Sequence, residues 1–164
     1  MPLPCHLTVD GENQGKIDGS CELQGRENTI MVEAMNHEVY IPHDPHSGLA
    51  TGKRVHQPLT ITKFYDKASP KLYQALCSGE HMKEVVIKWY RTAPTGQEEH
   101  YFTHRLENAI IVSIKAWMPN VLDKDKEFYS HMEDVSFTYS KIAWTWEIDG
   151  VEAQDAWLKP RSSR

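Results

Sequence analysis

Runs of strand-type residues occupy most of this sequence and constrain its fold more than any other feature. Val, Ile, Thr and aromatic side chains suit a half-buried pleated surface. They dominate PCHLTVDG at 4–11, NTIMVEAMNHEVYIP at 28–42, PLTITKFYD at 58–66, EVVIKWYR at 84–91, EHYFTHRLENAIIVSIKAW at 99–117 and EDVSFTYSKIAWTWEI at 133–148. APTG at 93–96 separates two of these runs and predicts a hairpin connection.

Inside two of the runs, the apolar residues change from one set of alternate positions to the other. In the second run this parity switch lies between Val32 and Val39, and in the last run it lies between Tyr139 and Ile142. Successive strand residues point to opposite faces, so each switch predicts a bulge or bend.

One segment, at about 69–79, has the signals of a helix instead. Ser69 can cap its start, Pro70 fits the first helical position and Gly79 fits just past its end. Helical spacing places three apolar residues on one stripe: Leu72, Ala75 and Leu76. Cys77 lies beside that stripe and is predicted to be a small packing residue.

These elements predict one domain over residues 1–164. The expected class is mainly β, a closed or nearly closed β-barrel with one short flanking α-helix. An extended loop at about 42–57 and a loosely defined C-terminal tail at about 158–164 complete the expected architecture.

Composition excludes several functional classes for the 164-residue chain. Its formal charge of −5 argues against nucleic acid as a partner, since phosphate binding needs a concentrated basic face. No apolar run reaches the roughly 20 residues that span a bilayer, and no Sec-type signal peptide is visible. Three unclustered cysteines favour free thiols in a reducing cytosol, so we expect the protein to be made and folded inside the cell.

The extended loop contains an unusual stretch, HDPHSGLATGKRVH at 43–56, rich in metal-ligand types. Imidazole and carboxylate groups bind zinc, copper or nickel, so a metal site is one hypothesis. A zinc site usually pairs ligands on defined turns and completes the set from elsewhere in the chain. Here the ligand types crowd into one Gly/Pro-rich loop, which favours exposed or interface histidines: His43, His46 and His56, with Asp44.

The same stretch does not match a phosphate-binding loop. A P-loop has four residues between its glycines and then Gly-Lys-Ser/Thr. Gly48 and Gly52 are separated by three residues, Arg54 stands where the hydroxyl residue belongs, and a strand-type run follows.

No residue set predicts catalysis or a bound cofactor. G-x-S-x-G is absent, and adjacent strand residues such as Glu98 and Glu99 point to opposite faces. Two alternatives remain open: a metal-dependent enzyme using the 43–56 histidines, or a monomeric ligand-binding β domain with an aromatic platform. The residues that could form such a platform are Trp89, Trp117, Trp144 and Trp146. The other interpretation of these tryptophans is that they pack across neighbouring strands.

In the order of these segments, the chain resembles the haemolysin-coregulated protein (Hcp) family, whose members are the tail-tube subunits of bacterial type VI secretion systems. The resemblance covers nearly the whole chain, to about Trp157. Its most specific parts are IPHDPHSGLATGKRVHQPLTITK, KASPKLYQALCSGE, VVIKWYR, HYFTHRLENAIIVSI and EDVSFTYSKIAWTW.

The resemblance implies a non-enzymatic protein that closes into hexameric rings, which stack into a secreted tube. Its implied partners are copies of itself, the spike, the contractile sheath and effector proteins in the lumen, without nucleic acid or membrane insertion. It further implies that the loop at 42–57 contacts neighbouring subunits. The residues assigned to this interface are His43, Asp44, His46, Gly48, Gly52, Lys53, Arg54 and His56.

Overall fold

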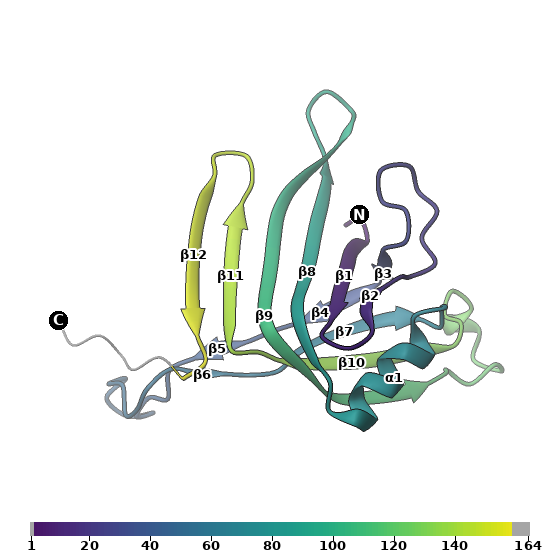
Figure 1. Ribbon diagram of the computed structural model, residues 1–164. Coiled ribbons are helices and arrows are strands. Elements are labelled where there is room, and N and C mark those ends of the chain that lie inside the picture. The colour runs from purple at the N-terminus through teal and green to yellow at the C-terminus, as the bar shows by residue number, and fades with distance from the viewer. Residues whose placement is uncertain (1, 159–164) are drawn as a thin grey trace.

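A computed structural model describes residues 2–158, which are mostly β-structure with one α-helix (Figure 1). The predicted tail at 158–164 lies outside these residues except for Leu158. The strands are β1 (Cys5–Gly11), β2 (Gly15–Ile17), β3 (Ile30–Val32), β4 (Ala34–Asn36), β5 (Val39–Tyr40), β6 (Val55–His56), β7 (Leu59–Phe64), β8 (His81–Thr92), β9 (Glu98–Trp117), β10 (Met132–Thr138), β11 (Lys141–Trp146) and β12 (Val151–Ala156). The mainly β class with one flanking helix is confirmed.

The main sheet is built around the two longest strands, β8 and β9. Its order is β2-β1-β8-β9-β10-β7-β4, and β11 with β12 extends from the other half of β9. The predicted hairpin at 93–96 joins β8 to β9, and Ala93 N donates to Gln97 O over 2.7 Å. Gly96 has φ +86°, the left-handed conformation that glycine adopts without strain.

The first parity switch marks a change of strand partner. β3 pairs with β1, whereas β4, one residue later, pairs with β7. Glu33 stands between them and donates its N–H to Thr62 O over 2.8 Å. The second switch is the break between β10 and β11 at Tyr139 and Ser140. The closed barrel is not confirmed, because the hydrogen-bonded order runs from β2 to β4 without returning to its start.

The helix α1 (Ser69–Ser78) lies between β7 and β8, with Pro70 in its first turn and Gly79 at its C-cap with φ +68°. Leu72 and Ala75 are buried. Two expectations were wrong. The N-cap is Ala68 rather than Ser69, whose hydroxyl instead points into a buried polar cluster. Cys77 is exposed because it lies off the buried stripe.

A single apolar core lies between the sheet and the helix. Its fully buried members alternate along the strands, as in Leu7 and Val9 of β1 and Val135 and Phe137 of β10. Burying such side chains contributes about 1.5–3 kcal/mol each. The helix packs its apolar stripe, including Leu72, against the same core.

A charged cluster is buried where β7, β10 and the start of α1 meet. Lys63 has no exposed surface, and Glu133 is 1% exposed. Lys63 Nζ pairs with Glu133 Oε1 and with Asp66 Oδ1, the latter over 2.9 Å, and donates to Ser69 Oγ over 3.0 Å. Ser69 Oγ donates in turn to Glu133 Oε1 over 2.7 Å. We call Lys63, Asp66, Ser69 and Glu133 the buried charge cluster.

The two longest loops lie at opposite ends of the molecule. Figure 1 shows the loop at 42–57 beyond β5 and β6 at one end, with the loop at 118–131 and α1 at the other. The second loop contains a 3-10 helix, η1 (Lys124–Lys126).

Candidate functional site

The loop at 42–57, here called the arm, is a narrow two-stranded ribbon. β5 pairs with β6 at its root, and His43 bridges to Ala50 farther out. At the tip Gly48 N donates to Asp44 O over 2.8 Å, and Gly48 takes φ +73°. Local hydrogen bonds therefore order the arm although it has no apolar core of its own.

The predicted interface residues divide into an outer and an inner group. His43, His46, Gly48, Gly52 and Lys53 are exposed on the outer part of the arm. Asp44 is partly covered, and its Oδ1 accepts the His46 N–H over 2.8 Å. This backbone hydrogen bond favours the charged carboxylate and therefore lowers the pKa of Asp44.

Arg54 and His56 form the inner group and contact their own subunit. Arg54 forms a bidentate ion pair with Asp155 on β12, with Nη2 to Oδ1 at 3.0 Å. Arg54 Nη2 also lies 3.0 Å from Ala156 O. His56 is 4% exposed, so its imidazole is buried within the fold of its own chain.

His56 is the centre of a hydrogen-bonded chain. Its Nε2 lies 2.8 Å from Asp155 Oδ2, and its Nδ1 lies 2.6 Å from the Tyr139 hydroxyl. The same hydroxyl lies 2.8 Å from His37 Nε2. We call His37, Arg54, His56, Tyr139 and Asp155 the arm-root network.

Burial and neighbouring charges act on the pKa in opposite directions at Asp155 and in the same direction at Tyr139 and at His37. Burial would raise the pKa of Asp155, but hydrogen bonds and charge from Arg54 and His56 outweigh it and lower that pKa. Burial raises the pKa of Tyr139 far above its ordinary value, and the charge of Asp155 adds to the effect. Burial, followed by the nearby His56, lowers the pKa of His37.

An aspartate, a histidine and a hydroxyl in sequence form the arrangement used to activate nucleophiles. Tyr139 does not meet the other requirements of that chemistry. Its raised pKa keeps the phenol protonated, and only 5% of the residue is exposed. Trp157 covers the site, stacked on His56 with ring centroids 5.6 Å apart. The chain of hydrogen bonds is therefore suited to holding the arm.

The ligand types of the arm do not converge on one point. His43 and His46 lie on the exposed outer part, whereas His56 is buried at the root. Within residues 2–158, no group of three or more His, Cys, Asp and Glu side chains is placed to hold a metal ion. Three of the tryptophans lie beside β9: Trp89 and Trp146 are opposite Phe102, and Trp144 is opposite His104. Trp89 donates Nε1–H to His104 over 2.9 Å, Trp144 packs on the core, and Trp146 packs on Tyr101.

Three members of the arm-root network were missed by sequence reasoning: His37, Tyr139 and Asp155. His56 and Asp155 are 99 residues apart, and no spacing rule connects them. The one available signal was the number of polar residues at the base of a protruding loop, because buried polar groups need partners.

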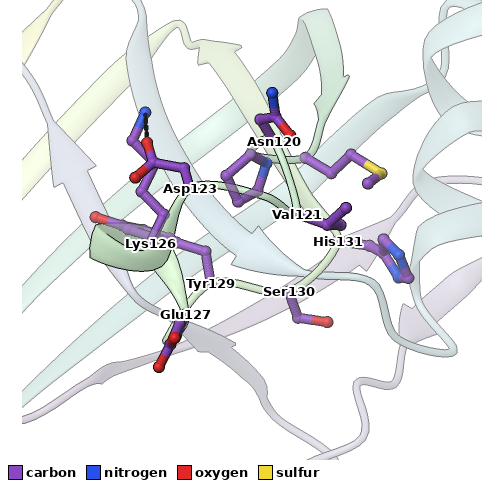
Figure 2. Close-up of a pocket in the computed structure, with 10 residues that line it drawn as sticks. Asn120, Val121, Asp123, Lys126, Glu127, Tyr129, Ser130 and His131 are labelled. Atoms are coloured by element: carbon purple, nitrogen blue, oxygen red, sulfur yellow. Dashed lines mark ion pairs between the residues drawn. The ribbon is translucent and has the colours of Figure 1, made fainter.

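The loop at 118–131 encloses a depression, and Figure 2 shows the residues that line it. Its polar groups are bonded locally, as in the Lys126–Asp123 ion pair at 3.7 Å. The loop as a whole also carries strongly exposed apolar side chains: Met118, Val121, Leu122, Phe128 and Tyr129. The acidic and basic residues that line the depression are Asp123, Lys126, Glu127 and His131.

The described cysteines, Cys5, Cys21 and Cys77, all carry free thiols. No helix of the described chain is long and apolar enough to cross a membrane.

Fold and site together define a mainly β protein with protruding surface features and without a converged catalytic set in residues 2–158. The chain belongs to the Hcp family: the family model described as "Type VI secretion system effector, Hcp" matches residues 6–146. It is thus a protein of the type VI secretion system.

Individual relatives agree with this family over almost the full length. The chain is 47% identical to the "Major exported protein" of Pseudomonas aeruginosa, covering 98% of each sequence. It is 42% identical to the solved structure of secreted protein Hcp3 of Pseudomonas aeruginosa, with a TM-score of 0.79, covering 95% of this chain and 99% of that one. Hcp1 of Escherichia coli EAEC 042 is 36% identical with a TM-score of 0.85 and the same two coverages.

Proposed function

We propose that residues 1–164 form one structural, non-catalytic subunit that assembles into hexameric rings, and that these rings stack into the inner tube of the secretion system. On this proposal the strands complete a barrel-like wall around the core. The protein is made in the bacterial cytoplasm, leaves through the secretion apparatus with the spike and the sheath as partners, and carries effector proteins in the lumen.

The observation that carries the proposal is the exposure of large apolar side chains at both ends of one subunit. At the arm, Ile41 is 45% and Leu49 70% exposed. At the opposite end, Val121, Leu122 and Phe128 are 81%, 84% and 95% exposed (Figure 1). Exposed apolar patches mark contact surfaces, and two different patches on opposite ends suit the head-to-tail contacts of a cyclic ring.

An unpaired sheet edge supports the same conclusion. β12 pairs only with β11 among the described strands, and Val151 on it is 63% exposed. Free strand edges and exposed apolar residues invite pairing, which a closed ring of identical subunits satisfies.

Size-exclusion chromatography with light scattering and negative-stain microscopy test the proposal. We expect six-subunit particles with a central hole. A protein that stays monomeric at high concentration would contradict it and favour the monomeric binding domain. Stoichiometric zinc, copper or nickel in elemental analysis would instead favour the metal-dependent enzyme.

The role of the arm is tested by deleting residues 45–54. The ribbon contributes little to the core, so circular dichroism of the variant should retain the β signal while rings are lost. Loss of the β signal would show that the arm is needed for folding, contrary to the proposal.

A further inference from the structure

The arm is attached to the main fold through a few polar contacts. β5 and β6 form a separate two-stranded sheet that pairs with no other strand of the described chain. One more backbone hydrogen bond, from Gln57 N to Glu38 O at 3.0 Å, extends this pairing by one residue on each side of the root. It joins the two sides of the ribbon to each other and not to the main sheet. The direction in which the arm projects therefore depends on the side chains at its root.

Asp155 collects most of those contacts. It accepts two hydrogen bonds from Arg54 and one from His56, and these two residues stand at the end of the returning half of the ribbon, at its root. Arg54 also reaches Ala156 O, so the grip spans the last two residues of β12. A bidentate guanidinium–carboxylate pair fixes orientation as well as distance.

We propose that Asp155, on the last strand, is a positioning residue for assembly: together with Tyr139, which lies between β10 and β11, it forms a latch that presents the arm to neighbouring copies in one direction. The inference rests on the proposed function and deepens it. A preorganised arm loses less conformational entropy when it docks, so a released arm weakens assembly even if its contact residues are intact.

Aromatic packing covers the latch. Trp157 stacks on His56 at an interplanar angle of 25° and meets Tyr139 edge-on, with centroids 5.1 Å apart. Because Trp157 directly follows β12, the strand that grips the arm also shields the grip from water. Charge-assisted hydrogen bonds are stronger in such a partly desolvated site.

The hydrogens of the latch can be assigned in one consistent direction. With both histidines neutral, His37 donates to the Tyr139 oxygen, Tyr139 donates to His56 Nδ1, and His56 Nε2 donates to Asp155. If His56 is doubly protonated, its Nδ1–H donates to the tyrosine oxygen, and the hydroxyl turns to donate to His37 Nε2, which can accept once the hydrogen of the neutral His37 ring is on Nδ1.

A second proton breaks this pattern. With both imidazoles charged, two N–H groups point at one phenol oxygen, and the hydroxyl hydrogen of the buried Tyr139 has no acceptor in the network. The groups facing His37 are Tyr139, His56 and His104, and those facing His56 also include Asp155 and Arg54. Acidification that charges both histidines therefore loosens the latch.

Replacement of Asp155 by Asn tests the latch, with Glu152→Gln as the matched control. Glu152 lies on the same strand, is exposed, and has no ion pair among the described residues. Hydrogen exchange of peptides covering 54–57 is measured by mass spectrometry on the monomer fraction, so that contacts between copies do not contribute. Ring content is measured separately by light scattering, and global stability by thermal unfolding.

We expect exchange at 54–57 in Asp155→Asn to rise on the order of ten-fold at pH 7.5, with a shift in melting temperature below about 4 °C and a loss of rings. Glu152→Gln should match the unaltered protein in exchange at 54–57 and in thermal unfolding, the two measurements that do not depend on contacts between copies along β12. Because burial lowers the pKa of His37 from its ordinary 6.5, exchange at 54–57 in the unaltered protein, corrected for intrinsic rate, should rise only on acidification below about pH 6.5, and this rise should be absent in Asp155→Asn.

Unchanged exchange and unchanged ring content in Asp155→Asn would overturn the latch. So would a ring loss accompanied by unfolding of the core, because the effect would then be on stability instead of position. If the unaltered protein forms no rings, the proposed function fails, whereas the exchange of the monomer still decides whether Asp155 holds the arm.

Discussion

The buried charge cluster and the arm-root network use similar chemistry in different surroundings. Both join elements distant in sequence through a carboxylate, a cation and a hydroxyl. Lys63 and Glu133 are enclosed by the core, whereas the side chains of Arg54 and Asp155 are 19% and 20% exposed. Enclosure makes the first cluster decisive for folding, and partial exposure lets the second control a protruding segment without being essential to the core.

The cost of breaking each set follows from this difference. A charge left unpaired in the core cannot be solvated by water, so removing its partner costs far more than the pair itself contributes. At the arm root, water can replace a lost partner on one side. Glu133 Oε2 is already a buried oxygen with no hydrogen-bond partner among the described residues, which makes this carboxylate sensitive to further loss.

The largest expected effect is that of Lys63→Met. It leaves the Glu133 carboxylate and the Ser69 hydroxyl in the core without their cation, and we expect a loss of about 3–5 kcal/mol in the free energy of unfolding. Urea denaturation measures it. The double variant Lys63→Met with Glu133→Leu should recover most of the loss, because it removes both charges. If Lys63→Met alone loses less than about 1 kcal/mol, the buried charge cluster is no more important for folding than the arm-root network.

Acid should weaken the fold next most strongly. Burial lowers the pKa of His104 from 6.5 to about 4, with a further contribution from His37. Above pH 6.5 the folded and unfolded chains are both neutral at this residue. Below it the unfolded chain binds a proton that the folded one does not, so stability falls between pH 6.5 and about 4 by about 3 kcal/mol.

Denaturant titrations across that pH range check the expected slope. His104→Gln, which keeps an acceptor for the Trp89 indole N–H but cannot be charged, should flatten the profile. His46→Gln on the exposed arm is the control and should leave it unchanged. A profile equally steep in His104→Gln would assign the acid sensitivity to other groups.

An intermediate effect is expected at the arm root. Tyr139→Phe keeps the buried ring but leaves His37 and His56 without the hydroxyl between them, which should cost about 1–2 kcal/mol. Thermal unfolding gives the value. A cost equal to that of Lys63→Met would show that the arm root is as essential to folding as the buried charge cluster.

The smallest effect on folding is expected at the arm tip. Leu49→Ser removes an exposed apolar side chain without a core contact, so the free energy of unfolding should change by less than about 0.5 kcal/mol. Ring content in light scattering should nevertheless fall if the tip docks on another copy. Lys83→Gln, at an exposed position of β8 away from the arm and the loop at 118–131, serves as the polar control. Unaltered ring content in Leu49→Ser would show that the arm tip does not form the contact between copies.

Local features of the fold were predictable because their causes are local. Pro70 and Gly79 bound α1, APTG forms the β8–β9 hairpin, and the parity changes after Val32 and Tyr139 mark real interruptions of strands. The N-cap was misplaced because Ser69 is drawn by Lys63 and Glu133 into the core, a tertiary contact that local capping preference does not contain.

The site was predicted less completely than the fold. The arm was located from its Gly, Pro and polar residues, and the structure shows His43, His46 and Lys53 exposed on it. His56 looked equivalent to these histidines in the sequence, but the fold buries it 2.6 Å from Tyr139. Equal residue types on one loop thus acquire different roles, depending on which of them faces the sheet.

By itself, the sequence determined the strand-rich class, the single helix, the hairpin and the position of the arm, since backbone preferences, side-chain alternation and turn residues act over a few neighbours. Only the tertiary structure decided that Arg54 and His56 meet Asp155, and that Lys63 meets Glu133. Those pairs are set by strand register and by how distant segments pack, and the free energy of a buried charge depends on the partners that packing brings to it.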